Sequence, residues 1–412
     1  MPGTAGPTTA TITTTLRTNN AAGNGDDAPA FGGSLMSETA TVGSASGQTQ
    51  ADQTVERLRR IALDALARMF RPDRGLHAFR LRRTSGDPAL EGESIRYTAT
   101  VLIGLASESA QTAGCVLSGL SPDIVGDRLV DRLDSMRDLG EVALTLWAIR
   151  ALGHDGAGRV LSRLRALDPA RADVPTVELA WSLTALAFEG HAPTDAGLAR
   201  AVADRLVASF NHRSNLFPHR PVGSHASGLR GHVSCFADLV YPIQALSHFH
   251  RFSGDKAALE TATACAKRMG ELQGPAGQWW WHYDVRTGRV VERYPVYAVH
   301  QDAMAPMALF ACAAVSGEDF RPAIRRSLQW LTAPAEMAES LIDERAAVIW
   351  RKVARREPGR LVRAAQAGLS RMHPRLRLPA PDLLFPPIRI DYESRPYHMG
   401  WILHAWPPGR TI

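Results

Sequence analysis

The chain has 412 residues, of which 45% are hydrophobic and 21% are charged, and its formal net charge is +6. This composition is typical of a globular protein that buries a large core. The positive charge is too small and too dispersed to indicate nucleic-acid binding, and no uncharged apolar run reaches the roughly 18 residues of a membrane-spanning helix. The first residues lack the charged and apolar segments of a secretory signal peptide, so we expect a cytosolic protein.

Residues 1–50 are rich in Thr, Ala, Gly and Ser and are predicted to form a disordered tail, which is followed by one domain at 51–412. The four cysteines have neither the spacing of a zinc site nor that of a disulfide framework, and we interpret them as reduced, buried thiols. They are Cys115, Cys235, Cys265 and Cys312. Motifs such as HExxH, GxSxG and the phosphate-binding glycine loops do not occur in their required context. The sequence therefore predicts no metal and no cofactor.

From residue 53 onwards, amphipathic segments alternate with segments that are apolar nearly all round. A helix with one apolar stripe covers a surface, whereas a helix that is apolar all round is buried. The amphipathic segments, which predict an outer layer, are 53–70, 124–136, 155–167, 194–211, 255–272 and 319–332. The apolar segments, which predict an inner layer, are 94–108, 139–152, 175–190, 233–252, 301–315 and 395–406.

These segments pair into about six helical hairpins with weak self-similarity, as between the starts of the inner segments at 238–242 and 302–306. The sequence therefore predicts an all-α fold, an (α/α)6-type toroid of helical hairpins. One small β-hairpin is predicted within 279–296, with Gly288 in its turn at positive φ. The prolines of 378–395 predict an extended connector.

Acidic residues lie near the predicted starts of the inner helices. In a closed ring of hairpins the inner helices run parallel, so their N-termini surround one mouth. Acids in a first helical turn are stabilised by the helix dipole by about 0.3–1 kcal/mol each, and we interpret Glu93, Glu141 and Glu178 in this way. Asp238 and Asp302 lie at two further starts.

Asp302 is the main catalytic candidate because histidine and aromatic residues surround it in the sequence. We predict that Asp302 acts as a general acid or base, with His300 or Asp238 as its partner. Three adjacent tryptophans, 279–281, cannot all face one core, so at least one is expected to face a cavity or solvent. The alternative interpretation is a packed loop that only caps the toroid.

The predicted substrate-binding residues are the aromatic and histidine side chains near the mouth. They are Trp280, Trp281, Tyr283, Tyr241, Tyr297, Tyr397 and His398. The last two belong to the segment 395–401, which meets the same mouth if it begins the last inner helix. His398 is a lone histidine, and such a residue more often has a structural role than a role in a site. The basic segment 351–377 is interpreted as a solvated helix face, or else as a docking patch for an acidic partner or glycan.

The segment Gln273-Gly-Pro-Ala-Gly277-Gln-Trp279 resembles the QW repeat of squalene-type terpene cyclases, and it occurs once. The segment that begins at Val299 is similar to the acid motif DxDD of these cyclases. Only Asp302 matches an acid of the motif, because Val299 and Gln301 replace the other two, and the middle acid is the proton donor of that family. This resemblance implies a terpenoid-cyclase or prenyltransferase-like toroid.

The predicted architecture also resembles the α/α toroid of six-hairpin glycosidases, unsaturated glucuronyl hydrolases, N-acylglucosamine epimerases and several polysaccharide lyases. This resemblance implies a carbohydrate-active enzyme, a hydrolase, lyase or epimerase, with a small-molecule or oligosaccharide substrate at the mouth. The alternatives are a terpenoid-cyclase-like protein with an apolar central cavity and a non-catalytic scaffold that binds a glycan or protein partner. An open, polar, tryptophan-edged cleft favours a sugar. The sequence does not predict an oligomeric state.

Overall fold

The structure is a computed structural model that describes residues 37–84, 86–188, 195–222, 228, 230–354 and 389–412, and a few residues between 365 and 387. The chain divides into two compact units, Met1–Ser46 and Gly47–Ile412. The predicted disordered tail falls largely on residues 1–36, outside the described residues, and stays a prediction. The account below concerns the second unit.

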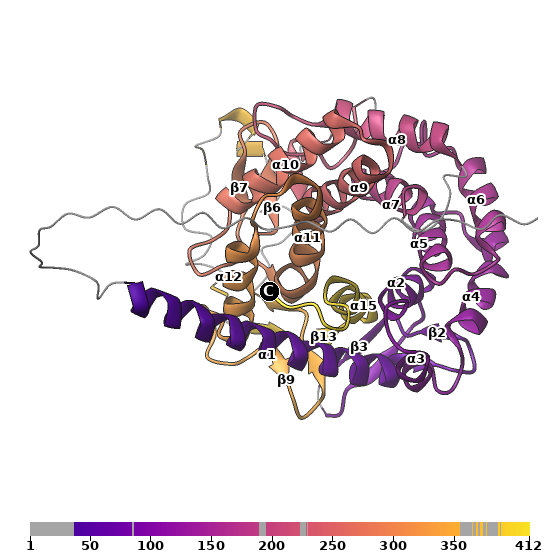
Figure 1. The fold of residues 1–412 in the computed structure, drawn as a ribbon, viewed down its shortest axis with the longest axis horizontal. Helices are drawn as coiled ribbons and strands as arrows, with labels where there is room; N and C mark the ends of the chain where they lie inside the picture. The colour runs from indigo at the N-terminus through magenta and orange to yellow at the C-terminus, as the bar shows by residue number, and fades with distance from the viewer. Residues whose placement is uncertain are drawn as a thin grey trace, which may run out of the picture. The chain divides into compact units, whose positions relative to one another are not determined.

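Inner helices form a closed ring in this unit (Figure 1). Within the described residues the ring has six members: α2 (Ile95–Leu105), α5 (Leu139–Ala151), α7 (Thr176–Leu186), α9 (Ala237–Ser253), the π-helical turn η2 (His300–Met304) continued by α11 (Ala305–Ser316), and α15 (Pro396–Ala405). Each packs against the next, and α15 packs against both α2 and η2, which closes the ring. The predicted toroid is thus confirmed, with inner helices that are apolar nearly all round and largely buried.

Amphipathic helices form the outer layer. They are α1 (Ser37–Met69), α3 (Ala110–Val116), α4 (Pro122–Val130), α6 (Ala157–Ala166), α8 (Ala196–Ser209), α10 (Lys256–Glu271) and α12 (Arg321–Thr332). In α12, for example, Ile324 and Leu328 are buried, whereas Arg326 and Gln329 are exposed. The short helix α3 was not predicted. None of the helices in the described part of the chain combines the length and the hydropathy that crossing a bilayer requires.

Short antiparallel strands fill the connections that run from an outer helix to the next inner helix, so they lie at the mouth. The predicted hairpin is present as β6 (His282–Asp284) and β7 (Arg289–Glu292), with Gly288 at a φ of 67°, and β5 (Val233–Cys235) adds a third strand. A second sheet joins β8 (Val296–Tyr297), β11 (Lys352–Ala354) and β12 (Arg389–Asp391). A third joins β13 (Glu393–Ser394), β3 (Arg80–Arg82) and β4 (Ala89–Glu91). The pairs β1 (Phe70–Arg71) with β2 (Leu76–His77), and β9 (Ile342–Asp343) with β10 (Val348–Ile349), complete the strands of the described residues.

Acidic residues lie at the starts of the inner helices, where they act as caps or lie in the first turn. Asp138, rather than Glu141, caps α5, because its carboxylate accepts the Glu141 backbone N–H at 3.0 Å. Glu141 and Glu178 lie in the first turns of α5 and α7, where the helix dipole favours an acid. Glu93 lies before the cap of α2 and pairs with Arg74 at 2.9 Å.

The segment that resembles a QW repeat joins α10 to α12. The Gln273 side-chain amide donates to the carbonyl oxygens of Gly277 at 3.0 Å and Ala323 at 2.9 Å, and its oxygen accepts from Arg326. Gly277 has a φ of 98°, and a Cβ there would lie 2.1 Å from the Arg326 carbonyl oxygen. Trp279 is fully buried. This segment therefore fastens two outer helices together and contributes nothing to the lining of the mouth.

The ring closes through direct backbone contact between α2 and α15. A Cβ on Gly104 would lie 2.4 Å from the carbonyl oxygen of Gly400, and a Cβ on Gly400 would lie 2.8 Å from that of Thr100. Real side chains do not approach a backbone so closely. Glycine at both positions is therefore required for the two helices to meet.

Substitution of the closing glycine should destabilise the protein. We expect Gly400→Ala to lower the free energy of unfolding by about 1–3 kcal/mol, because the added methyl group forces the two helices apart. The control is Gly114→Ala in α3, where a Cβ meets nothing within 4 Å, and which should raise stability by about 0.5–1 kcal/mol. Urea unfolding of the two variants measures both effects. If Gly400→Ala and Gly114→Ala changed the free energy of unfolding equally, the close contact between α2 and α15 would not be needed for the ring to close.

Candidate functional site at the mouth of the ring

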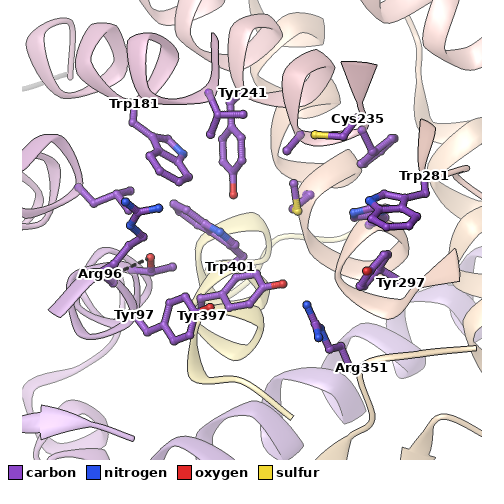
Figure 2. Close-up of a pocket in the computed structure, with 17 residues that line it drawn as sticks. Arg96, Tyr97, Trp181, Cys235, Tyr241, Trp281, Tyr297, Arg351, Tyr397 and Trp401 are labelled. Carbon is purple, nitrogen blue, oxygen red and sulfur yellow. Dashed lines mark hydrogen bonds between the residues drawn. The ribbon is translucent and has the colours of Figure 1, made fainter. Parts of the chain in front are cut away.

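A cavity of about 380 Å³ opens at the mouth, where the inner helices begin (Figure 2). All six inner helices contribute to it, mostly from their first two turns. These contributions are Arg96, Tyr97 and Thr100 of α2, Leu144 of α5, Val177 and Trp181 of α7, Ala237 and Tyr241 of α9, His300 and Met304 of η2, and Tyr397 and Trp401 of α15. The connecting strands add Cys235, Phe236, Trp281, Tyr297 and Arg351. The cavity thus lies where the sequence predicts a binding site.

Aromatic rings form most of the walls and hold one another in place. Trp181 contacts Tyr241 edge-on, with ring centroids 5.1 Å apart. On the opposite side, Trp281 stacks on His282 with centroids 3.9 Å apart and meets Tyr297 edge-on. Figure 2 shows the hydroxyl group of Tyr241 pointing into the space between these walls. The cavity therefore offers flat apolar faces together with hydroxyl groups.

Two arginines from different parts of the ring reach the cavity. Arg96 forms an ion pair with Asp138 and lies 4.0 Å from Glu178. Arg351 pairs with Glu393 at 3.1 Å, and its guanidinium group lies 5.3 Å from the centre of the Tyr297 ring. Both guanidinium groups are therefore fixed by acids and remain able to donate further hydrogen bonds.

His300 is the imidazole that lines the cavity. Its ring lies between Phe236, at 4.4 Å, and Tyr297, at 5.1 Å. Burial lowers the pKa of His300 to about 3, and the neighbouring His398 and His282 add to this effect. Within the described residues its Nδ1 atom has no hydrogen-bond partner. At neutral pH the ring is thus uncharged, and its surroundings disfavour the protonated form.

Asp302, the main catalytic candidate from the sequence, is buried in the ring wall and does not line the cavity, because its carboxylate faces α15. Its two carboxylate oxygens lie 2.8 and 2.9 Å from Nε2 of His398, and its backbone oxygen accepts from the Trp406 indole at 2.6 Å. Side chains two residues apart along a helical turn point to nearly opposite sides, so Asp302 faces α15 when His300 faces the cavity. Burial raises the pKa of Asp302. The pair with His398 therefore fastens η2 to α15.

The other predicted residues separate into two groups. Tyr241, Trp281, Tyr297 and Tyr397 line the cavity, as does His300. Asp238, Trp280, Tyr283 and His398 do not line it, because each is buried in the surrounding wall. The Tyr283 hydroxyl donates to the Trp280 carbonyl oxygen at 3.0 Å. Of the three adjacent tryptophans, Trp281 alone faces the cavity, in agreement with the argument that one of them must leave the core.

Several lining residues were missed by the sequence argument. Arg96, Trp181 and Trp401 lie in the first or second turn of inner helices, so their positions alone could have indicated them. Arg351 does not lie at the start of an inner helix, so its position in the sequence did not indicate that it lines the cavity. It precedes β11, which reaches the mouth by pairing with β8. The segment 351–377, to which Arg351 was assigned as part of a basic face, lies largely outside the described residues.

A carboxyl group with a perturbed pKa lies beside Arg96. The Glu178 side chain is 13% exposed. Burial raises its pKa and Asp138 adds to the rise, whereas Arg96 opposes it. Burial raises the pKa of Glu141 in the same way. These acids border the cavity at the starts of α7 and α5, and neither is among the residues that line it.

The fold, but not the sequence, has recognisable relatives. No protein-family model and no curated protein sequence matches this chain. Among solved structures it resembles an unsaturated glucuronyl hydrolase specific for heparin, with a TM-score of 0.55 and 13% identity over 86% of this chain and 95% of that one. It also resembles the cellobiose 2-epimerase of Bacillus thermoamylovorans B4167, with a TM-score of 0.57 and 10% identity over 86% of this chain and 98% of that one. A sugar epimerase from a ruminal bacterium is similar as well, with a TM-score of 0.58 and 10% identity over 87% of this chain and 100% of that one. At these identities the likeness establishes the six-hairpin α/α-toroid fold.

Buried neutral histidines should make the protein sensitive to acid. Burial lowers the pKa of His77, His300 and His404 to about 3 each. In the unfolded chain they take up a proton below about pH 6.5. The three neutral rings therefore contribute fully to the free energy of unfolding above pH 6.5. Between pH 6.5 and pH 3 this contribution falls by about 1.4 kcal/mol per pH unit for each ring.

His77→Phe should make this loss of stability shallower by about 1.4 kcal/mol per pH unit between pH 6 and 4, because one titrating ring is removed. His77 suits the test because it lies in β2 and does not line the cavity. Urea unfolding over this pH range measures the slopes. Between pH 7 and 8 the difference between variant and wild type should stay constant, since histidine is then neutral in both states. Identical slopes from pH 6 to 4 would contradict the assignment.

Proposed function

We propose that this protein is a carbohydrate-active enzyme that binds a saccharide ring in the cavity at the mouth. The observation that carries the proposal is the composition of the cavity walls, in which aromatic faces alternate with hydroxyl, guanidinium and imidazole groups. A sugar ring presents C–H faces that pack on aromatic rings and hydroxyl groups that need hydrogen-bond partners. The cavity volume of about 380 Å³ is within the range of small-molecule sites.

The alternative functions fit this cavity less well. An isoprenoid would need an apolar chamber, whereas Arg96, Arg351 and His300 place polar groups on several sides. The segment similar to a cyclase acid motif also carries Gln301 where the proton donor of those enzymes stands, and Gln301 hydrogen-bonds the backbone of Trp279. A scaffold would need no cavity at all, and a non-catalytic glycan-binding protein would bind sugar without turnover.

The residues that line the cavity favour a lyase or an epimerase over a hydrolase. Hydrolysis of a glycosidic bond usually needs two carboxyl groups that flank the bond about 5–9.5 Å apart. Among the described residues that line the cavity there is no carboxylate. Epimerisation and elimination instead begin with removal of a proton from carbon, and His300 offers an imidazole nitrogen without a partner among the described residues. A pKa of about 3 makes this ring a weak base, so the role requires the negative charge of a bound substrate to raise that pKa. The fold likeness includes a glucuronyl hydrolase as well as two sugar epimerases, so the choice rests on the lining alone.

In this mechanism His300 accepts the proton from a carbon next to a carbonyl or carboxyl group. The negative charge that develops on the oxygen is stabilised by a guanidinium group such as Arg351, in a site from which the aromatic walls exclude water. Burial raises the pKa of the neighbouring tyrosines, that of Tyr397 to about 12, so they stay protonated. A hydroxyl such as that of Tyr241 gives its proton to the other face of the carbon. After the product leaves and solvent enters the cavity, the proton held by His300 passes to the phenolate, which restores both groups. Asp302 and His398 position η2 and do not touch the substrate.

The proposal includes a cytosolic location. Its support is that Cys115, Cys235, Cys265 and Cys312 are all free thiols, as is usual in a reducing compartment. The expectation that all four are buried is wrong, because Cys115 is exposed and Cys235 is only partly buried. The substrate is proposed to be a small saccharide or the end of an oligosaccharide.

Trp281→Ala should weaken saccharide binding without unfolding the protein. Wild type is first screened by calorimetry against neutral oligosaccharides, uronic-acid oligosaccharides and isoprenoid diphosphates. For the best saccharide, loss of the Trp281 face should weaken binding about tenfold, which corresponds to roughly 1.4 kcal/mol. The control is Phe252→Ala, at the far end of α9, where the ring is 36% exposed, and its affinity should equal that of wild type. Binding of isoprenoid diphosphates alone, or equal affinities in both variants, would contradict the proposal.

A further inference from the structure

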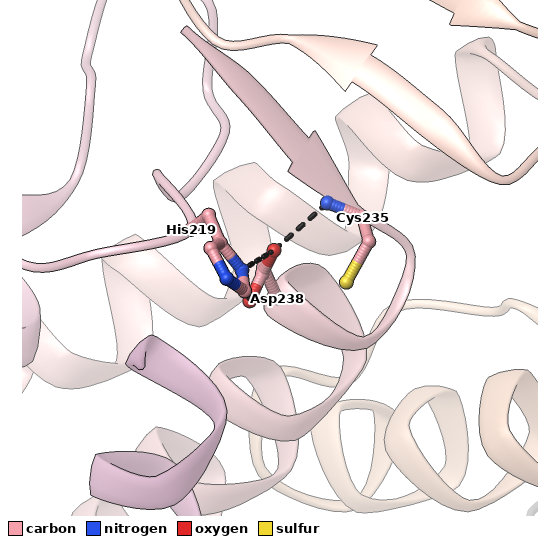
Figure 3. Close-up of side chains that lie close together, drawn as sticks. All are labelled: His219, Cys235 and Asp238. Atoms are coloured by element: carbon pink, nitrogen blue, oxygen red, sulfur yellow. Dashed lines mark hydrogen bonds and ion pairs between the residues drawn. The ribbon is translucent and has the colours of Figure 1, made fainter. Parts of the chain in front are cut away.

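Three side chains of the types that bind metal ions converge beside the cavity (Figure 3). They are His219, Cys235 and Asp238, and one ligand atom from each lies within 4.8 Å of the others. Cys235 also lines the cavity. The cluster plays no part in the mechanism proposed above.

The backbone holds the three residues on separate elements. Thr176, at the start of α7, donates its N–H to the His219 carbonyl oxygen at 3.0 Å and its hydroxyl to that of Pro218 at 2.6 Å. Cys235 ends β5, where it pairs with His282 of β6. Asp238 lies in the first turn of α9. The three side chains are therefore brought together by the fold and not by one flexible loop.

A helix cap explains only part of this arrangement. The Asp238 carboxylate accepts the Cys235 backbone N–H at 2.8 Å, as an acid in the first turn of a helix commonly does. The cap does not require an imidazole 3.1 Å from the same carboxylate, nor a thiol beside it. Asp238 is fully buried, and a buried carboxylate is costly unless a positive group or a metal compensates for it. Without a metal, His219 is that group, because its hydrogen bond to Asp238 raises the pKa of the imidazole.

We propose that His219, Cys235 and Asp238 together bind one divalent transition-metal ion of the zinc type, with one ligand atom each. A nitrogen, a sulfur and an oxygen suit Zn²⁺, and three protein ligands leave a fourth position for water or a sugar hydroxyl. The usual bond lengths, about 2.3 Å to sulfur and about 2.0 Å to nitrogen or oxygen, require the ligand atoms to close by only about 1 Å. His219 can make this movement because its side chain is 51% exposed.

Binding would replace protons that now point at Asp238. The Cys235 thiol loses its proton to solvent when sulfur becomes a thiolate ligand, so affinity should increase with pH. Burial and the nearby Asp238 raise the pKa of this thiol, which is the cost that the metal has to offset. Because Cys235 borders the cavity, the ion would lie at its wall.

Cobalt binding tests the site directly. Chelator-treated full-length protein is titrated with Co²⁺, which gives a sulfur-to-cobalt charge-transfer band when a thiolate is a ligand, and then with Zn²⁺ by calorimetry. Wild type should bind one equivalent and show the band. Cys235→Ser should lose the band and bind Zn²⁺ at least 100-fold more weakly, and His219→Gln should also bind it more weakly. The control Cys115→Ser removes an exposed thiol and should behave as wild type.

Two outcomes would overturn the proposal: a wild type without the charge-transfer band, or a band that persists in Cys235→Ser. Far-ultraviolet circular dichroism checks that each variant is folded, and His219→Gln changes a partly exposed side chain, so it provides an answer even if another variant misfolds. These titrations contain no saccharide. Failure of the metal site and failure of the proposed carbohydrate activity are therefore separate results.

Discussion

The structure depends on the need of the inner helices to bury apolar surface on every side. A helix such as α5, buried along nearly its whole length, is stable only when neighbours cover it all round. A closed ring meets this need without an edge, and the outer amphipathic helices cover the ring from outside. Closure requires α2 and α15 to meet at Gly104 and Gly400, where the absence of side chains allows the two backbones to touch. The rest of the architecture follows from this ring.

Ring closure also determines where chemistry can take place. Because the hairpins repeat in one direction, the starts of all inner helices surround one mouth, and the strands that precede them lie there too. Side chains from the first turns therefore converge although they are far apart in the sequence, as Trp181 and Trp401 show. Polar side chains such as Arg96 are anchored by acids outside the cavity, while aromatic rings fix one another.

Much of the fold could be predicted from the sequence, because the alternation of amphipathic and fully apolar helices is a local property of the chain. The mouth was found for the same reason, and Tyr241, Trp281 and Tyr297 followed from their proximity to helix starts. The direction of individual side chains could not be predicted, since Asp302 and His300 are two residues apart and face opposite ways. Arg351 and His219 could not be found either, because strand pairing and a contact with Thr176 bring them to the mouth.

The central claim is that His300 removes a proton from a saccharide carbon in the cavity. Solvent deuterium exchange tests it most directly: the saccharide that binds best is incubated with enzyme in deuterated water and followed by nuclear magnetic resonance. The account predicts that wild type incorporates deuterium at one carbon during turnover. His300→Gln should bind the saccharide within a few-fold of wild type and incorporate no deuterium. Turnover by wild type without deuterium incorporation, or exchange that persists in His300→Gln, would contradict the account.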